Sequence, residues 1–596
     1  MRTSLIAGLI LSAGLPATVA QGQTFYNGTN ATGQLVLTRT VNAMQTAQTL
    51  PQLGAVRAFS LRSLARTVAV PEKVPQILSR QLHPPLSPSP LRALGAVRSL
   101  AVQLQPGLAV VKAPGISGFN GLTHFDQRQA SNGNQFSVEP PNPSIAVANG
   151  FILEGVNNAV QVYDMSGKSL LPRVLASNEL FGVSPAINRA TDDNGVYPTD
   201  MRVFFDQGIN RWFVLQRSQD NDFAGNMINR SHIYLAVSQS PDPTGTYNIY
   251  VADTTNASHP GCPCLADYPQ IGADQYGFYI SANEFNTSFD VTLEQFVDAT
   301  IFAISKAGLA AGATNPTAYK FTIPFGSGFE FAIQPATTPP GASYFLASGG
   351  VEYFASTEGR TLEGSNVALW AMSGTSGLAT GQSSPLLTQV LVPTFSYIWP
   401  NFATQPDGPR PYGATLGPVP VIDGGDTRAL SLSYAGARLY LTFGTAVTDE
   451  HGKNLAGGAY ITLSPTLRSG VLKAQVLHQS YLSVTNNHLL RPSVAVNADG
   501  RGSIAATVVG PDWYPSAAFV PVDTFSTPST VQIAAAGKLP EDGFTGYPDG
   551  GGLARWGDYS TAVAGTGGSV WSVVEYITDL PRTDLANWDT FIMQTQ

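Results

Sequence analysis

Two stretches of this chain share one layout although they lie far apart in the sequence. Ala266–Phe285 reads ADYPQIGADQYGFYISANEF, and Gly557–Tyr576 reads GDYSTAVAGTGGSVWSVVEY. Each opens on Asp-Tyr, continues as two apolar runs around a Gly-containing turn, and closes on Glu followed by an aromatic residue, with the same Asp-to-Glu spacing. A strand–turn–strand unit that recurs at long spacing predicts a repeated β architecture.

The chain after Gly121 continues this pattern. Short apolar or alternating runs are bounded by Gly, Pro, Asn and Asp, and no convincing helix exceeds about ten residues. We distinguish seven such units, which begin near Asn142, Asp200, Ala266, Phe329, Asp426, Arg491 and Gly557. A four-stranded sheet cannot bury both faces alone, so we expect the units to be arranged radially as blades. The sequence predicts an all-β fold, a β-propeller of seven blades, with six as the alternative because the Phe329 unit is the weakest.

The first residues have the layout of an export signal. Met1–Ala20 contains a basic start at Arg2, an apolar stretch and a small-residue exit, which together are typical of a secretory signal peptide. We therefore expect a secreted or periplasmic protein. No later stretch approaches the roughly 20 apolar residues that a membrane span requires, so we expect no membrane span.

Residues 21–121 differ in composition from the rest. They are rich in Ala, Leu, Pro, Ser and Arg, and the string LGAVR occurs twice. We interpret this segment as a poorly ordered, low-complexity basic leader or linker. A pro-segment or arm that docks on the acidic remainder, and a helix on a membrane surface, are the alternatives. The propeller is then expected to occupy residues 122–596.

The net charge of −8 argues against nucleic acid as a partner. A protein or a carbohydrate is the expected ligand, and we expect the chain to be a monomer.

Several aspartates stand where inner strands of the blades are expected to begin. They are Asp200, Asp267, Asp426 and Asp558. Inner strands line the central channel of a propeller, so these side chains should converge near its axis. They could bind a cation such as Ca²⁺, raise one another's pKa, or cap turns and bond to neighbouring blades. Arg202 and Arg428 could instead neutralise them. We expect no cofactor other than such a channel cation.

Further candidates lie in the repeated unit itself. Glu284 and Glu575 end second strands, and either could pair with Asp267 or Asp558 as half of a two-carboxylate site for glycoside hydrolysis. An exposed acid or an inter-blade partner for an Arg is the structural interpretation. Tyr268 is more often a packing residue than a catalytic one. If the protein is an enzyme, the catalytic candidates are Asp200, Arg202, Asp267, Tyr268, Glu284, Arg428, Asp558 and Glu575.

The only cysteines, Cys262 and Cys264, lie in HPGCPCLAD. An even pair in an oxidising compartment favours a disulfide, although a single intervening residue makes the ring small and strained. Free or intermolecular thiols, and a soft-metal site with His259 and Asp267, are the alternatives.

Three motifs together carry a resemblance to a known group of proteins. They are the DYPxxG…GFYIxxNEF unit, the DxRVxxD…RWF unit and the terminal RWGDYS…VW…EY unit. Their combination resembles secreted bacterial β-propeller proteins, mostly uncharacterised, that are similar in fold to the sialidase/neuraminidase superfamily. The resemblance covers about Asn142–Gln596. The Asp box expected of a sialidase is missing: Asp206-Gln207-Gly208 with Trp212 is one residue too long and lacks the Ser.

Two functional classes follow from these features. Nucleophile-elbow, zincin, Walker and dinucleotide motifs are absent from the sequence, which favours a non-catalytic propeller that binds a protein or glycan through its loop face. The alternative is a polysaccharide-active hydrolase, or a lyase in which an Arg neutralises a uronate while a Tyr or His removes the proton. A structural repeat protein of the envelope is a third possibility. The first two classes differ in whether the catalytic candidates share one open pocket.

Overall fold

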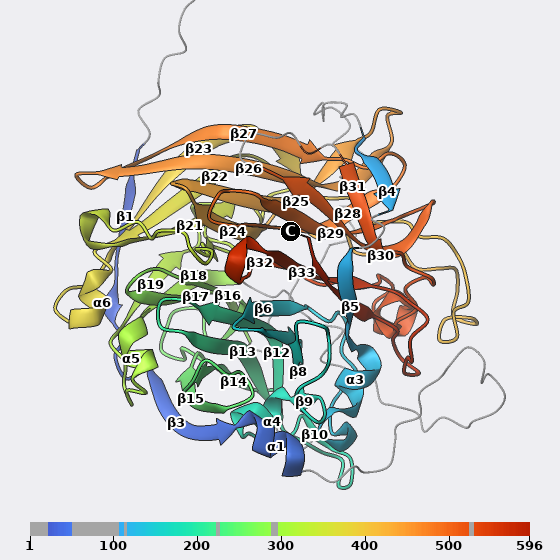
Figure 1. The fold of residues 1–596 in the computed structure, drawn as a ribbon, viewed down its shortest axis with the longest axis horizontal. Helices are drawn as coiled ribbons and strands as arrows, with labels where there is room; N and C mark the ends of the chain where they lie inside the picture. The colour runs from blue at the N-terminus through green and yellow to red at the C-terminus, as the bar shows by residue number, and fades with distance from the viewer. Residues whose placement is uncertain are drawn as a thin grey trace, which may run out of the picture.

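Seven sheets surround a single axis in the computed structural model of the chain (Figure 1). The structure describes residues 22–49, 107–112, 116–221, 227–287, 296–523, 528 and 530–595. We number the sheets as blades 1 to 7 in the order of their inner strands. The seven-bladed β-propeller predicted from the sequence is thereby confirmed.

The inner strands form a closed ring. They are β6 Ser144–Ala148, β12 Val196–Asp206, β16 Cys264–Ala273, β20 Gln334–Pro335, β24 Ala429–Ala435, β28 His488–Val496 and β32 Thr561–Ala564. Each contacts the next, and β32 contacts β6. β20 has only two residues, which explains why the Phe329 unit gave the weakest sequence signal.

Within each blade the strands follow one another outward and pair antiparallel. The second strands are β7 Phe151–Val156, β13 Arg211–Asn221, β17 Gly277–Asn286, β21 Val351–Thr357, β25 Arg438–Thr448, β29 Gly502–Gly510 and β33 Val570–Tyr576. The third strands are β8 Ala159–Asp164, β14 Met227–Ser238, β18 Phe296–Ser305, β22 Glu363–Ser373, β26 Asn454–Arg468, β30 Trp513–Val522 and β34 Asp589–Gln594. The fourth strands of blades 1 to 6 are β9 Leu175–Ala176, β15 Thr246–Asp253, β19 Ala318–Pro324, β23 Leu386–Ile398, β27 Val471–Leu482 and β31 Thr530–Ala535.

Blade 7 joins the two ends of the propeller. Its fourth strand is β5 (Ser117–Thr123), which precedes blade 1 in the chain and pairs antiparallel with β34. Ile592 faces Phe119 in this register. The outermost strand of the last blade thus comes from the segment that precedes blade 1, so blade 7 contains strands from both sides of the other six blades in the sequence.

The N-terminal residues add outer strands to further blades. β1 (Thr24–Asn27) pairs with β23, β2 (Thr29–Asn30) with β19, and β3 (Leu35–Asn42) with β15. Figure 1 shows these blue segments on the outer rim of the propeller. We call β1 to β3 the N-terminal strap.

One further strand from this region, β4 (Ala109–Lys112), pairs parallel with β31 of blade 6. The structure here differs from the expected leader, because described parts of residues 21–121 belong to blade sheets. The boundary at residue 121 is therefore not a boundary of the sheet system. The predicted signal peptide and residues 50–106, which include both copies of LGAVR, lie outside the described residues.

The α-helices within the described residues are few and short. They are α1 Ala43–Thr49, α3 His124–Gln129, α4 Ser177–Phe181, α5 Lys306–Ala310 and α6 Ser376–Thr380. A two-stranded hairpin, β10 Ile187–Asn188 with β11 Asp193–Asn194, stands outside the blades. In the part of the chain that the structure describes, no helix is long and apolar enough to cross a membrane.

The hydrophobic core lies between neighbouring blades. One buried cluster joins Leu235 of blade 2 to Ile280 of blade 3, and another joins Tyr353 of blade 4 to Leu441 of blade 5. Each sheet covers a face of the next, so no blade has to bury both faces by itself. This packing fixes the inner strands around the axis and so determines which side chains meet there.

We expect the N-terminal strap to stabilise the propeller. Without it, the edges of β15, β19 and β23 would lose their backbone partners, each lost hydrogen bond costing about 0.5–1.5 kcal/mol net. A protein that begins at residue 43 should therefore melt at a lower temperature than one that begins at residue 22. Adding a synthetic peptide of residues 22–42 should restore part of the loss, whereas equal melting temperatures would contradict the role of the strap.

Candidate functional site

Three blades have the same backbone irregularity within their inner strand. Asp200, Tyr268 and Arg491 have φ angles of 56°, 52° and 52°, and the register of β12, β16 and β28 shifts beside them. Positive φ is uncommon for residues other than Gly and costs about 1–3 kcal/mol where it occurs. The repeated bulge places a charged or aromatic side chain at the same end of three inner strands of the ring.

Two of the predicted aspartates share one arginine. Nε of Arg217 donates to Oδ2 of Asp200 at 2.6 Å, and Nη2 of Arg217 lies 3.0 Å from Oδ1 of Asp267. All three residues are buried. Arg217 lies on β13 of blade 2 and Asp267 on β16 of blade 3, so this triad ties two blades together. A buried carboxylate is stable only when it is paired and hydrogen-bonded in this manner.

Asn142 bridges the triad to the third aspartate. Its Nδ2 lies 2.8 Å from Oδ1 of Asp200 and 3.0 Å from Oδ2 of Asp558, while its Oδ1 accepts from the Asp558 amide at 2.8 Å. Nη2 of Arg555 lies 3.5 Å from Oδ1 of Asp558. The carboxylates of Asp200, Asp267 and Asp558 are thus brought together as expected, each with an internal partner.

Aromatic and guanidinium groups lie next to these acids. The guanidinium of Arg202 lies 3.2 Å from the ring centroid of Tyr559, and the guanidinium of Arg428 lies 4.6 Å from that of Tyr268. The two tyrosine rings meet edge to face at 5.9 Å. Burial raises the pKa of Tyr268 to about 12. A phenol that resists ionisation in this way packs between blades and is poorly suited to act as a base.

Asp426, the fourth predicted aspartate, is held by its neighbour along the chain. Both of its carboxylate oxygens accept from Arg428, with 2.6 Å between Nη2 and Oδ2. In blade 6, Nη2 of Arg491 donates to the Trp556 carbonyl at 3.0 Å. Arg428 therefore neutralises Asp426, as the sequence suggested. Arg202 does not pair with Asp200. The cation that pairs with Asp200 is Arg217 of the next strand, β13.

We call this whole set the axial cluster: Asn142, Asp200, Arg202, Arg217, Asp267, Tyr268, Asp426, Arg428, Arg491, Asp558 and Tyr559. The pKa of the Asp267 carboxyl group reflects its burial and the charges around it. Burial, together with the carboxylates of Asp200 and Asp558, raises that pKa to about 6. Arg217 acts in the opposite direction. Burial is the dominant cause, since taking a carboxylate out of water disfavours its charged form.

The two predicted glutamates lie elsewhere. Glu284 faces Ala266, not Asp267, across the β16–β17 pair, and because successive side chains of a strand point to opposite faces, it contributes no pairing to Asp267. Burial raises the pKa of Glu284 to about 7. Glu575 accepts from the Gly557 amide at 2.7 Å. The predicted pairing of Glu284 with Asp267 is therefore not formed, whereas Glu575, whose pKa burial holds well above its usual range, lies near enough to Asp558 for that carboxylate to raise the pKa as well.

A layer of loops lies beside the axial cluster. In this layer Glu139 accepts from the amide and the hydroxyl of Thr545 at 3.0 and 2.9 Å, and the Arg555 amide donates to the same hydroxyl at 2.9 Å. Burial raises the pKa of Glu139 to about 7 and holds that of its neighbour Glu541 well above the usual range. These loops connect directly to Asp558 through Arg555.

Two pockets of the described structure are lined by residues outside the axial cluster. One pocket, of about 50 Å³, lies on the axis beyond the cluster and is lined by residues such as Phe204, Phe205, Thr337 and Val496. It has no ionisable side chain in its lining. The cluster members thus share one buried site, where they are held by contacts with one another.

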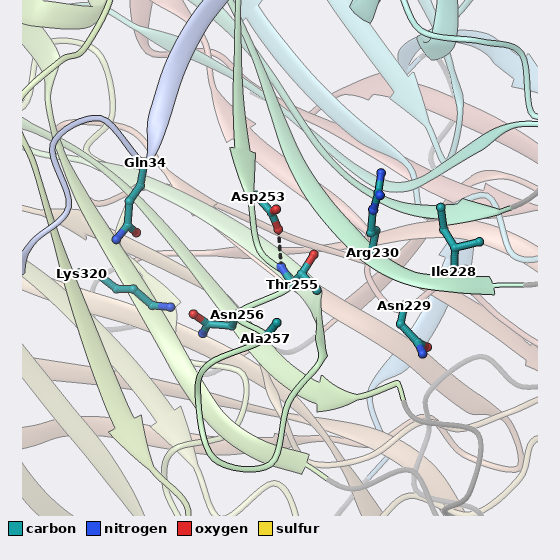
Figure 2. Close-up of a pocket in the computed structure, with 9 residues that line it drawn as sticks. All are labelled: Gln34, Ile228, Asn229, Arg230, Asp253, Thr255, Asn256, Ala257 and Lys320. Carbon is teal, nitrogen blue, oxygen red and sulfur yellow. Dashed lines mark hydrogen bonds between the residues drawn. The ribbon is translucent and has the colours of Figure 1, made fainter.

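An open pocket of about 400 Å³ lies off the axis, between the outer parts of blades 2 and 3. Figure 2 shows its residues: Gln34, Ile228, Asn229, Arg230, Asp253, Thr255, Asn256, Ala257 and Lys320. We call it the rim pocket. It falls within the 300–1,000 Å³ typical of small-molecule sites, and it includes Gln34, which follows β2 in the N-terminal strap.

No group of three or more potential metal ligands occurs in the described ranges. The four aspartates proposed for a channel cation have guanidinium or amide partners at hydrogen-bonding distance instead. Arginine side chains therefore supply positive charge next to these aspartates. The sequence alone had left open whether a bound cation or an arginine would do so.

Sequence reasoning missed Arg217 and Asn142. Arg217 stands in the apolar run RWFVLQRS, where a lone charge in a buried strand indicates a buried partner. Identifying that partner requires the register of β12 on β13, which pairs Thr199 with Arg217 and then shifts. Asn142 precedes Pro143-Ser144, and Arg491 precedes Pro492-Ser493 in the same way. This shared layout is the signal in the sequence that could have identified Asn142.

The structure places Cys262 and Cys264 as a bonded pair. His259, the other candidate in that loop, contacts Asp298 with 2.6 Å between Nε2 and Oδ2. The imidazole thus has a carboxylate partner other than the proposed Asp267.

We expect the exported protein to contain no free thiol. Denatured, non-reduced protein should gain no mass on alkylation, and reduction should expose both Cys262 and Cys264. Two alkylatable thiols before reduction would contradict the disulfide.

Comparison with known proteins gives distant structural similarities only. No family model and no curated protein sequence matches the chain. The Hadza microbial sialidase Hz136 has 8% sequence identity and a TM-score of 0.32, over 75% of this chain and 73% of that one. A single-residue mutant of NanB sialidase from Streptococcus pneumoniae has 10% identity and a TM-score of 0.32, over 72% and 70%. An exo-β-1,3-galactanase from Clostridium thermocellum has 8% identity and a TM-score of 0.27, over 67% and 81%.

Proposed function

We propose that this protein is an exported, glycan-binding β-propeller in which the axial acids hold the blades together and do not catalyse a reaction. The observation that carries the proposal is the pairing of Asp200 and Asp267 with the single buried Arg217. Asp267 belongs to the repeated motif and Asp200 to the inner strand of the preceding blade, and the charges of both are already paired inside the fold.

Hydrolysis of a glycosidic bond requires a different arrangement. Two carboxyl groups must flank the bond from opposite sides and be free to exchange a proton or attack the sugar. Here Asp558 is bridged to Asp200 by Asn142, so a sugar would have to displace these contacts to reach either acid. A lyase would need a tyrosine or histidine able to lose its proton, and the raised pKa of Tyr268 works against that role.

The rim pocket, of about 400 Å³, has room for a small ligand. Amide, hydroxyl, guanidinium and ammonium groups line it, and these are the donors and acceptors that a polyhydroxylated ligand requires. We infer that a glycan is bound there by hydrogen bonds, at a distance from the axial cluster. Residues of the N-terminal strap and of two blades would contribute together.

A glycan-library screen of the purified protein tests this function. We expect binding to one or a few saccharides, with the bound saccharide recovered at unchanged mass after prolonged incubation. Recovery of shortened or unsaturated products would overturn the non-catalytic assignment in favour of a polysaccharide-active hydrolase or lyase. Failure to bind any saccharide would overturn the glycan-binding function itself.

A further inference from the structure

We propose that the rim pocket binds an acidic saccharide, with acidic groups of the saccharide held by Arg230 and Lys320 and the hydroxyl groups held by the surrounding amides. This inference rests on the proposed glycan-binding function and specifies its ligand class and its site.

The charges of the pocket favour an anionic ligand. Figure 2 shows Lys320 and Arg230 on opposite sides of the residues from Asp253 to Ala257. Neither cation has an ion pair at hydrogen-bonding distance among the described residues, although Lys320 lies near the buried carboxyl groups of Glu284 and Asp298 and Arg230 lies near Asp253. The one carboxylate in the lining, Asp253, accepts from the Thr255 amide at 2.8 Å. The lining therefore has two cations against one acid, and the acid is already engaged.

Uncharged polar groups complete the lining. Gln34, Asn229 and Asn256 present side-chain amides, each able to donate and to accept hydrogen bonds as sugar hydroxyls require. Oδ1 of Asn229 is buried without a hydrogen-bond partner, which is costly unless a ligand or water satisfies it. Asn229 also has a φ of 54°, and backbone strain of this kind clusters at binding sites.

The absence of one residue type also bears on the ligand. None of the nine described lining residues is aromatic, so the pocket offers no flat apolar surface for the face of a sugar ring. A neutral saccharide would have to rely on hydrogen bonds that replace equivalent bonds to water, each worth only about 0.5–1.5 kcal/mol of net free energy. Charge-assisted bonds to a carboxylate are roughly twice as strong. An acidic sugar is therefore the ligand that this lining favours.

The test measures binding of the full chain to three sets of probes by calorimetry. They are oligouronates, neutral oligosaccharides of equal length, and sulfated oligosaccharides, which separate a carboxylate from anionic charge in general. We expect the oligouronates to bind most tightly, with an affinity that falls as salt is added because the cations are partly exposed. Arg230→Gln and Lys320→Met should each weaken this binding by about tenfold, as expected for loss of a charge-assisted bond.

Arg468→Gln is the matched control, because Arg468 is an exposed arginine on blade 5, far along the chain from the pocket. It should leave affinity unchanged. Wild-type binding that both pocket substitutions leave intact would overturn the acidic-saccharide site while the proposed function stands. Preference for neutral or sulfated probes would also overturn it. Binding to none of the probes or library glycans would overturn the proposed function instead.

Discussion

Replacing Arg217 with methionine is expected to lower the free energy of unfolding by about 3–5 kcal/mol, the usual cost of removing one partner from a buried ion pair. Methionine retains an unbranched apolar stem but has no charge. Asp200 and Asp267 would then face each other in the interior without their shared cation. Each could avoid the cost only by binding a proton.

Chemical denaturation of Arg217→Met and wild type measures this effect. Arg468→Met is the control, because Arg468 is exposed and surface substitutions usually stay within about 0.5 kcal/mol. Acidification should recover part of the Arg217→Met loss, since protonated aspartates no longer need the guanidinium. Equal stability of Arg217→Met and the control would show that the triad does not hold blades 2 and 3 together.

The second large effect concerns pH: we expect stability to fall as the pH rises from about 6.5 to about 8.5. Burial raises the pKa of Glu139, Glu154 and Glu284 to about 7 each. In the unfolded chain these groups have pKa values near 4.3 and have already lost their protons. The folded protein therefore binds more protons in this window, and proton linkage makes its stability decrease with rising pH.

Other buried groups explain why the effect should be measured between about pH 6.5 and about pH 8.5. Burial holds the pKa of Glu352, Glu575 and Asp589 well above their usual range, which extends the fall upward in pH. Burial lowers the pKa of His488 to about 4 and that of His124 well below its usual value. These histidines raise stability with pH, but only below about 6.5, the pKa of an unfolded histidine. Above that value the buried acids act together with His232, whose pKa is raised by its hydrogen bond to Asp220 and whose deprotonation changes stability in the same direction.

The measurement is a series of denaturation curves across this pH range. Glu284→Gln should flatten the slope, because glutamine cannot ionise and one pKa unit corresponds to about 1.36 kcal/mol. We expect the variant to approach or exceed the wild type in stability at the alkaline end. A wild-type stability that stays constant or rises between these pH values would show that the buried carboxyl groups are not protonated in the fold.

Much of the fold could be predicted from the sequence because blade strands carry strong local signals. Gly and Pro punctuation, alternating apolar residues and the repeated motif gave the units that became seven blades. The strap was missed for a different reason. Leu35–Asn42 reads LVLTRTVN and has the alternation of a strand, but the composition of the surrounding residues suggested a leader. Its partner strand β15 lies in the middle of the chain, where no local pattern can indicate the pairing.

The candidate site was predictable to the extent that it depends on strand order. Asp200, Asp267 and Asp558 converge because inner strands begin near the axis, which strand order alone predicts. Their partners depend on bulges and on exact register, which the sequence does not display. Arg217 is an example, because it forms an ion pair with Asp200 from the adjacent strand. Glu284 is another, because a one-residue offset places it on the opposite face of the sheet from Asp267.

Substitution of the repeated aspartates tests the central claim most directly. Asp267→Asn and Asp558→Asn would each be measured for melting temperature, affinity for the best-bound glycan and product formation on the same preparation. We predict a loss of about 1–3 kcal/mol of stability through weakened charge-assisted bonds, unchanged glycan affinity and no product from either variant or wild type. Loss of turnover at full stability in either variant would contradict the account, because the aspartate would then be catalytic.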